Sequence, residues 1–269
     1  MSPAQANGAA FFDLDRTLMA GSSAYHFGRA MYKAGQMSRR QIARDAFDQI
    51  RFRLQGASDA AVNVLLDRVL EGIKGRRVAD LRRLTPDVLA GILPRVYPQM
   101  LDVVREHQDA GRPAYIATAA SQPAAEILAQ ALAMDGAIGT RWEIEDGVYT
   151  GRLDGPFAYG EGKAAALREF AASNGIELSQ SWAYTDAVSD LPMLEAVGHP
   201  VAVNPDAELA EVARRQGWDV LRFEKLGERL RVAAAIAAAA AVGGSGSWLA
   251  ARRRARAPRG PLRGRRRPH

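Results

Sequence analysis

The sequence predicts an α/β protein, with a parallel sheet covered by helices on both faces and an all-helical segment inserted early in the chain. Three observations support this prediction. From about residue 100 onward, short apolar runs alternate with amphipathic stretches, as in strands joined by crossover helices. An apolar run at 9–14 adds a strand near the start. No strand signal interrupts residues 22–95, which are therefore predicted to be a helical insert.

The early part of the chain shows helical spacing after its first strand. Apolar residues recur every three or four positions over 38–54 and again over 58–73, where Ser38 and Ser58 precede the repeats and Gly75 follows the second. Pro86 suits the first turn of a third helix that begins at Thr85.

The later part alternates strands and helices. An Asp-Gly turn flanked by alternating apolar residues predicts a hairpin over 141–153. The remaining strands are predicted at 113–118, 181–186, 200–204 and 218–223, and the helices at 100–111, 123–133, 162–175, 190–198 and 206–217.

The composition bounds the class of protein. The chain has 269 residues, 48% of them hydrophobic and 25% charged, which suffices for one large globular domain or two modest ones. Cysteine is absent, which excludes disulfides and thiolate metal sites and fits a reducing cytosol. The opening MSPAQANGAA has neither a basic nor an apolar stretch, so we expect no secretory signal and a cytoplasmic protein.

Polar residues close three of the predicted strands. Asp13, Thr118 and Asp186 each lie where a buried strand ends. Ligands of parallel α/β sheets bind at this edge, so these residues form a candidate site. An Asp-rich turn after a strand is also common as a plain turn or helix cap, and Asp186 or Asp190 could cap the following helix, so both readings stay open.

The pair Asp13 and Asp15 is separated by one residue, so the side chains would point the same way if strand geometry persisted. Two carboxylates so close favour a bound cation or a shared proton. Asp13 and Asp186 offer hard oxygen ligands without His or Cys, which suits Mg²⁺ together with a substrate phosphate.

These acids suit phosphoryl transfer through a covalent intermediate. Asp13 would attack phosphorus, and Asp15 would protonate the departing alkoxide and then activate water. The hydroxyl of Thr118 and the ammonium of Lys163 would meet the charge of the transferred group. A lysine at a helix start is usually only solvated, so Lys163 is a candidate because of the residues that accompany it.

Four motifs together resemble the haloacid dehalogenase superfamily, in its phosphoserine-phosphatase-like subgroup. They are DLDRT at 13–17, IATAAS with Thr118, GEGK with Lys163, and YTDAVSDLPMLEAVGHPVAVNPD at 184–206. They occur in the family's order and span 9–206. The resemblance implies a Rossmann-like core over 9–21 and 100–230, and a helical cap over 22–99 that closes over the substrate.

The resemblance also implies a ligand set. Mg²⁺ would be held by Asp13, the backbone carbonyl of Asp15, and Asp186. The implied supporting residues are Thr17 and Asp190, the latter beside the motif lysine or around the metal. Dehalogenases of the superfamily lack the second acid because halide leaves without a proton, so Asp15 favours phosphate chemistry.

The chain departs from the family pattern at four positions. Arg16 and Thr185 stand where the family usually has glycine, and Thr118 and Ala187 stand where it usually has serine. The backbone at Arg16 must therefore suit a side chain that meets substrate or solvent. Every charged role remains filled, so we expect an active enzyme.

The substrate is less determined. The related phosphoserine phosphatases carry an acid shortly after the first motif, whereas no acid occurs here over 18–43. This disfavours phosphoserine and leaves another small or lipid-like phosphomonoester open. Candidates for facing the pocket, each of which could equally be surface or core of the insert, are Ser22, Ser23, Tyr25, His26, Arg51 and Arg53.

The C-terminal stretch explains the basic net charge of +6. Residues 252–269 hold nine Arg and no acid, so residues 1–251 hold 27 Lys and Arg against 30 Asp and Glu, a formal charge of −3. The stretch 231–251 is predicted as an Ala-rich terminal helix and 252–269 as a disordered tail. Twenty uncharged residues at 232–251 leave membrane insertion open, with weak contact between the tail and anionic lipids, whereas nucleic-acid binding is not expected.

The sequence therefore predicts a Mg²⁺-dependent phosphomonoester hydrolase that acts through an aspartyl-phosphate. Two alternatives remain open. One is a catalytically weak scaffold that its tail tethers to a membrane or an acidic partner. The other is a phosphotransferase that passes the phosphoryl group of the same intermediate to an alcohol.

Overall fold

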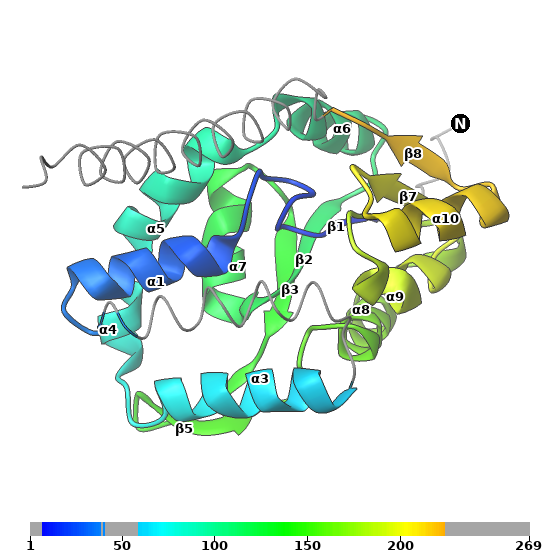
Figure 1. Cartoon of the computed structure of the whole chain (residues 1–269). Coiled ribbons are helices and arrows are strands. Elements are labelled where there is room, and N and C mark those ends of the chain that lie inside the picture. The colour runs from blue at the N-terminus through cyan, green and yellow to red at the C-terminus, as the bar shows by residue number, and fades with distance from the viewer. Residues whose placement is uncertain (1–6, 39, 41–58, 224–269) are drawn as a thin grey trace, which may run out of the picture. The chain divides into compact units, whose positions relative to one another are not determined.

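The computed structural model describes residues 7–38, 40 and 59–223. Its main sheet has six parallel strands in the order β3-β2-β1-β6-β7-β8, with β1 between β2 and β6 (Figure 1). The central position of β1 buries its three residues completely. The strands are β1 (Ala10–Phe12), β2 (Ala114–Ser121), β3 (Gly136–Thr140), β6 (Trp182–Thr185), β7 (His199–Val203) and β8 (Asp219–Leu221).

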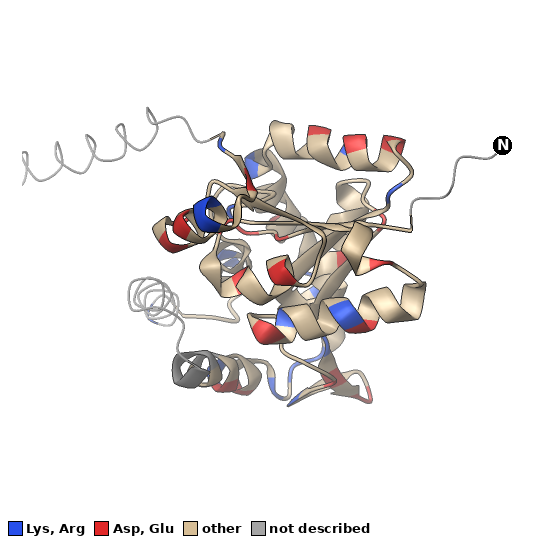
Figure 2. Ribbon diagram, turned by 90° about the vertical axis from the view of Figure 1, so that its right-hand side faces the viewer, with Lys and Arg blue, Asp and Glu red and all other residues tan. Residues whose placement is uncertain are grey.

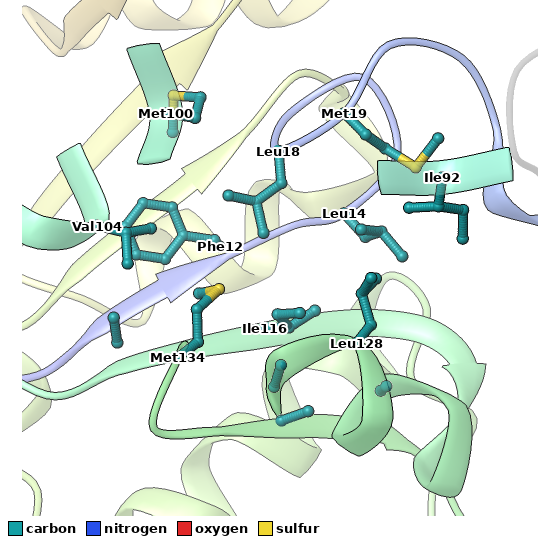
Figure 3. Packing of buried hydrophobic residues seen from close by; sticks show 14 of the residues in the cluster. Phe12, Leu14, Leu18, Met19, Ile92, Met100, Val104, Ile116, Leu128 and Met134 are labelled. Atoms are coloured by element: carbon teal, nitrogen blue, oxygen red, sulfur yellow. The ribbon is translucent and has the colours of Figure 1, made fainter. Parts of the chain in front are cut away.

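Helices cover both faces of this sheet. Phe12 and Phe11 are neighbours in β1 and therefore point to opposite faces, and each lies in a different apolar cluster. Figure 3 shows Val104 beside Phe12 in the first cluster. The helices on the face of Phe12 are α6 (Pro98–Asp109) and α7 (Gln122–Ala131), and those on the face of Phe11 are α8 (Glu161–Asn174), α9 (Leu191–Glu195) and α10 (Ala207–Gln216).

The named elements between β1 and α6 are helices, connected by turns and loops, in the part of this segment that the structure describes. A hairpin outside the main sheet is hydrogen-bonded to this helical segment. Gly75 N donates to Tyr149 O and Tyr149 N donates to Arg76 O, each at 2.9 Å. Figure 1 shows the hairpin beside α3. These elements are α1 (Ser23–Lys33), α3 (Asp59–Ile73), α4 (Val78–Arg82), α5 (Thr85–Ile92), the short 3₁₀ helix η1 (Leu93–Arg95), and the hairpin strands β4 (Trp142–Glu145) and β5 (Val148–Leu153).

The predicted fold class is confirmed, as are the hairpin and the helices that end at Ile73 and begin at Thr85. Three of the described α-helices and strands were missed. No helix was predicted over Ser23–Lys33 or Val78–Arg82, and no strand over Gly136–Thr140. The helix predicted at 38–54, apart from residues 38 and 40, lies outside the described residues, as do the Ala-rich helix at 231–251 and the tail at 252–269.

The missed strand β3 has a tertiary cause. Gly139 in the sequence GAIGT is a poor strand signal. In the structure a Cβ at this position would lie 2.9 Å from Ala120 O and from Gln122 N, so the start of α7 passes too close for any side chain. Gly139, which weakens the strand signal in the sequence, is also the residue that allows this strand to pack against the start of α7.

Within the described ranges, every helix is either too short or too polar to cross a bilayer. Figure 2 shows Asp and Glu interspersed with Lys and Arg along the outer helices. The predicted contact between the basic tail and a membrane concerns residues outside the described part and stays a prediction.

A buried histidine lies on α6, away from the strand ends. Arg112 Nε donates to His107 Nδ1 at 2.8 Å, so the neutral ring carries its proton on Nε2 and donates it to the Tyr184 hydroxyl at 2.7 Å. The pKa of His107 is lowered to about 4, chiefly by burial and in the same direction by the charges of Arg112 and His199.

We therefore expect the free energy of unfolding to decrease as the pH is lowered from about 6.5 to about 4. Over this range the unfolded chain takes up a proton on His107, whereas the folded chain does not. His107→Gln should remove this part of the dependence. Urea unfolding of wild type and His107→Gln at pH 7 and pH 5 measures it. An equal loss of stability between the two pH values in wild type and His107→Gln would contradict the assignment.

Candidate active site

Asp13 lies directly after β1 at the edge of the sheet. Its backbone N donates to Tyr184 O at 2.9 Å, which extends the pairing with β6 by one residue. The chain then turns sharply, since Leu18 N donates to Leu14 O at 3.1 Å. Only 12% of the Asp13 side chain is exposed, so its carboxylate lies in an almost completely buried site.

Lys163 contacts two carboxylates in this buried site. Its Nζ lies 2.7 Å from Asp13 Oδ1 and 2.7 Å from Asp190 Oδ2, and only 4% of the lysine side chain is exposed. Residues 150 positions apart are thus joined. The reading of Lys163 as a solvated lysine at a helix start is wrong.

Glycine explains how α8 brings Lys163 to the sheet. A Cβ at Gly162 would lie 2.0 Å from Phe157 O, so the start of the helix packs directly on backbone. Gly160 precedes the helix with a φ of 55°, a left-handed conformation that glycine adopts without strain. Both glycines of GEGK are therefore required by close approach or by backbone conformation.

Asp190 supports the lysine and does not cap α9. Thr185 donates its hydroxyl to Asp190 Oδ2 at 2.8 Å, and no side-chain hydrogen bond from Asp190 closes the helix start. Sequence reasoning treated Thr185 only as a departure from glycine. In the structure its hydroxyl orients the carboxylate that holds Lys163.

Asp186 follows β6 and pairs with Arg16. The distance from Arg16 Nη1 to Asp186 Oδ2 is 3.1 Å, with 5% of the Asp186 side chain exposed against 27% for Arg16. The carbonyl of Asp186 accepts from Asp206 N at 2.9 Å. The loops after β1 and β6 therefore bring the first and last motifs together.

Buried negative charge exceeds positive charge here. The pKa of Asp13 is raised to about 8, chiefly by burial; the charges of Asp190 and Asp186 act in the same direction, and Lys163 opposes them. For Lys163, the attraction of the two carboxylates outweighs burial and raises the pKa. Asp13 and Asp190 share Lys163, and Asp186 pairs with the partly exposed Arg16, so three carboxylates are met by two cations and the site favours a further cation.

The donor set fits Mg²⁺ as the implied metal. Within the described ranges, no three His, Cys, Asp or Glu side chains gather closely enough to hold a metal by themselves. The two buried carboxylates of Asp13 and Asp186 lie near enough to repel each other and offer hard oxygens, which suits this ion.

Asp15 takes a different direction from Asp13. Strand β1 ends at Phe12, so the premise that both acids follow extended geometry does not hold. Ser23 N donates to Asp15 Oδ1 at 2.8 Å and Ser22 Oγ donates to Oδ2 at 3.1 Å. Asp15 therefore lies against the N-terminus of α1, where the helical segment begins.

The two threonines of the predicted site are both buried. Thr118 lies inside β2 and not after it, and its Oγ1 accepts from Ala120 N at 3.3 Å. Thr17 is fully buried, and its Oγ1 has no hydrogen-bond partner among the described residues. Neither has a hydrogen bond to Asp13 or Lys163 in the described part of the chain.

The pocket candidates on α1 differ from one another. Tyr25 is 52% exposed, whereas His26 is buried against Gly91 of α5, where an added Cβ would lie 2.4 Å from the ring. Arg51 and Arg53 lie outside the described residues. A small, mostly apolar cavity of about 20 Å³ has room for about one water. It lies between α1, α5, α7 and the end of β2, and its lining includes Leu14, Phe27, Ala120 and Leu128.

The parallel sheet carries a carboxylate directly after β1, and this carboxylate pairs with a buried lysine. Such an arrangement points to a class of hydrolases. The family model for haloacid dehalogenase-like hydrolases matches residues 10–195, and the chain belongs to this family. The predicted resemblance is thereby confirmed, and with it the expectation of an enzyme.

Several similar proteins carry the name of an activity. The chain is 39% identical over 245 residues to a probable phosphatase of Mycobacterium tuberculosis, covering 89% of this chain and 85% of that protein. It is 37% identical over 260 residues to a phosphoserine phosphatase, SerB1, of the same organism, covering 94% and 83%. A histidinol-phosphatase of Neisseria meningitidis is 30% identical over 220 residues, covering 80% and 98%.

Solved structures share the fold. A protein of unknown function from Bordetella pertussis superposes with a TM-score of 0.69 at 30% identity, covering 79% of this chain and 97% of that one. A phosphoserine phosphatase, solved as an analogue of its phospho-aspartyl intermediate, superposes with a TM-score of 0.58 at 18% identity, covering 84% and 98%. The second likeness supports the fold alone.

Proposed function

We propose that this protein is a Mg²⁺-dependent phosphatase that hydrolyses a small organic phosphomonoester through an aspartyl-phosphate on Asp13. The observation that carries the proposal is the 2.7 Å pair between Lys163 Nζ and Asp13 Oδ1 in a buried pocket at the strand ends. One oxygen of Asp13 is held by the lysine, which leaves the other to attack phosphorus.

The first half of the reaction forms the intermediate. The free oxygen of Asp13 bonds to phosphorus as the bond from phosphorus to the ester oxygen breaks. The carboxylic acid of Asp15 gives its proton to the leaving alkoxide. Lys163, which Asp190 holds in place, offsets charge on the phosphoryl oxygens.

The second half restores the enzyme. The carboxylate of Asp15 takes a proton from water, whose oxygen bonds to phosphorus as the acyl phosphate bond breaks. Inorganic phosphate leaves and Asp13 is a carboxylate again. The hydrogen bonds from Ser22 and Ser23 fix the orientation of Asp15 for both proton transfers.

The Mg²⁺ ligands would be Asp13, the carbonyl of Asp15, and Asp186. When bound, the ion supplies positive charge that offsets the negative charge of the phosphate and of the carboxylates. Thr17 is a candidate supporting residue in the turn after β1, and the hydroxyl of Thr118, inside β2, is a candidate donor to the phosphate.

The helical segment at 22–99, joined by the hairpin, is proposed as a cap over the core formed by 9–21 and 100–230. It contacts the site through the N-terminus of α1, where Ser22 and Ser23 bind Asp15. Closure of such a cap would exclude water during transfer to Asp13. The coupling of α1 to Asp15 supports this division.

The substrate is proposed only as a class. Relatives include a phosphoserine phosphatase and a histidinol-phosphatase, so similarity does not select one substrate. The helix α1 carries no acid that could pair with a substrate ammonium. A small or lipid-like phosphate ester without an essential amino group agrees best with this surface.

Trapping of the intermediate tests the proposal. Asp15→Asn should lower hydrolysis of p-nitrophenyl phosphate about 10²- to 10⁴-fold and slow the attack of water. Mass spectrometry of the denatured, digested variant should then find phosphate on the peptide that contains Asp13. Wild type should turn over only with Mg²⁺ present.

Other outcomes identify the alternatives. No turnover of any phosphomonoester by folded wild type would favour the scaffold. Formation of phosphorylated glycerol when glycerol is added would indicate a phosphotransferase. Phosphate on a residue other than Asp13 would contradict the mechanism.

A further inference from the structure

The backbone at Arg16 is unusual. Its φ is 64°, in the left-handed region that non-glycine residues rarely adopt. The turn around it is closed by Leu18 N, which donates to Asp13 O at 3.3 Å and Leu14 O at 3.1 Å. Such a conformation persists where surrounding structure imposes it and is concentrated at functional sites.

The turn directs the guanidinium toward the last motif. Arg16 Nη1 lies 3.1 Å from Asp186 Oδ2, and the arginine is the more exposed partner, at 27% against 5%. The positive group therefore lies on the solvent side of a buried carboxylate. That carboxylate is also the one that the proposed function assigns to Mg²⁺.

We propose that Arg16 is an internal cation that competes with the divalent metal for Asp186 and thereby weakens metal binding. The inference rests on the proposed function, because that function makes Asp186 a ligand. A guanidinium in contact with Asp186 and a divalent ion on the same carboxylate repel each other strongly in a pocket of low dielectric. The arginine must move away when the metal binds, and the exposure of its side chain permits this movement.

Arg16→Gly and Arg16→Asn both test this competition. Each removes the charge, and glycine and asparagine both tolerate a left-handed backbone, so both variants should fold. Binding of Mn²⁺ alone to the metal-free protein is measured from the loss of the electron paramagnetic resonance signal of the free ion. We expect about tenfold tighter binding in both variants, and Arg16→Lys should stay within about threefold of wild type because it keeps the charge.

A matched control separates contact from net charge. Arg29 is exposed on α1, so Arg29→Gln removes one charge that does not touch Asp186. Its effect should stay below about twofold and vanish at 0.5 M salt, where exposed charges are screened, while the effect at Arg16 persists.

Three results would overturn the competition. Equal Mn²⁺ affinity in wild type, Arg16→Gly and Arg16→Asn would remove it while leaving the metal site in place. An equally large gain in Arg29→Gln at both salt concentrations would reduce the effect to net charge. Absence of binding in wild type and in both variants would overturn the assignment of Asp186 to the metal, and this inference with it.

Discussion

Asp13→Asn is expected to abolish phosphatase turnover while it stabilises the metal-free protein. Without a carboxylate at this position no acyl phosphate can form, so kcat should fall about 10⁴-fold or more. Hydrolysis of p-nitrophenyl phosphate with Mg²⁺ measures the loss. Retention of more than about 1% of wild-type kcat would place the nucleophile elsewhere.

The expected gain in stability follows from the pKa of Asp13. Folding raises this pKa from 3.8 to about 8, first through burial and then through Asp190 and Asp186. Between these values the folded chain keeps a proton that the unfolded chain loses, so the free energy of unfolding falls as pH rises. Asparagine removes the ionisation, and we expect a gain of about 1–3 kcal/mol at pH 7.5.

Urea unfolding with a chelator present measures this gain. The control is Asp102→Asn, which changes an acid that is 66% exposed and should leave stability nearly unchanged. Mg²⁺ should stabilise wild type more than Asp13→Asn, because binding to the folded state alone raises the free energy of unfolding. A metal-free Asp13→Asn protein less stable than wild type would contradict the surplus of buried negative charge.

Lys163→Met should cost both stability and activity. Methionine fills similar space but leaves Asp13 and Asp190 buried without their shared cation, a change that costs about 3–5 kcal/mol. Loss of the charge that meets the phosphoryl group should lower kcat about 10³-fold. Urea unfolding and steady-state kinetics measure the two effects.

A double variant keeps this expectation testable if Lys163→Met is poorly folded. Adding Asp190→Asn removes one of the unpaired charges, so Lys163→Met with Asp190→Asn should recover part of the stability but none of the activity. The exposed pair of Lys33 and Asp87 provides the control, since Lys33→Met should cost less than about 0.5 kcal/mol. A loss below about 1 kcal/mol in Lys163→Met would show that the buried pair is not a structural requirement.

Much of the architecture could be predicted from local pattern. Apolar runs such as that at 113–118 predict buried strands because a parallel sheet covered on both faces admits little else. The alternation of these runs with amphipathic helices sets the fold class. Strand β3 was missed because its Gly139 packs against the backbone at the start of α7, a contact that no local pattern reveals.

Several residues of the candidate site could also be predicted, but not all of their contacts. Polar residues that interrupt buried strands stand out in sequence, which is why Asp13, Thr118 and Asp186 were found. Thr185 was judged only by its departure from the family pattern, and its hydrogen bond to Asp190 became visible only in three dimensions. The direction of Asp15 depended on where β1 ends, which the apolar run did not define.

The sequence by itself determined which groups occupy the strand ends, because hydrophobic periodicity and buried polar residues are properties of the chain. The tertiary structure decided which of these groups touch. Lys163 reaches Asp13 because Gly162 lets α8 pack on the backbone of Phe157, and Arg16 reaches Asp186 because its turn is left-handed. Contacts across 150 residues depend on close approach and backbone conformation, which arise only when the elements pack together.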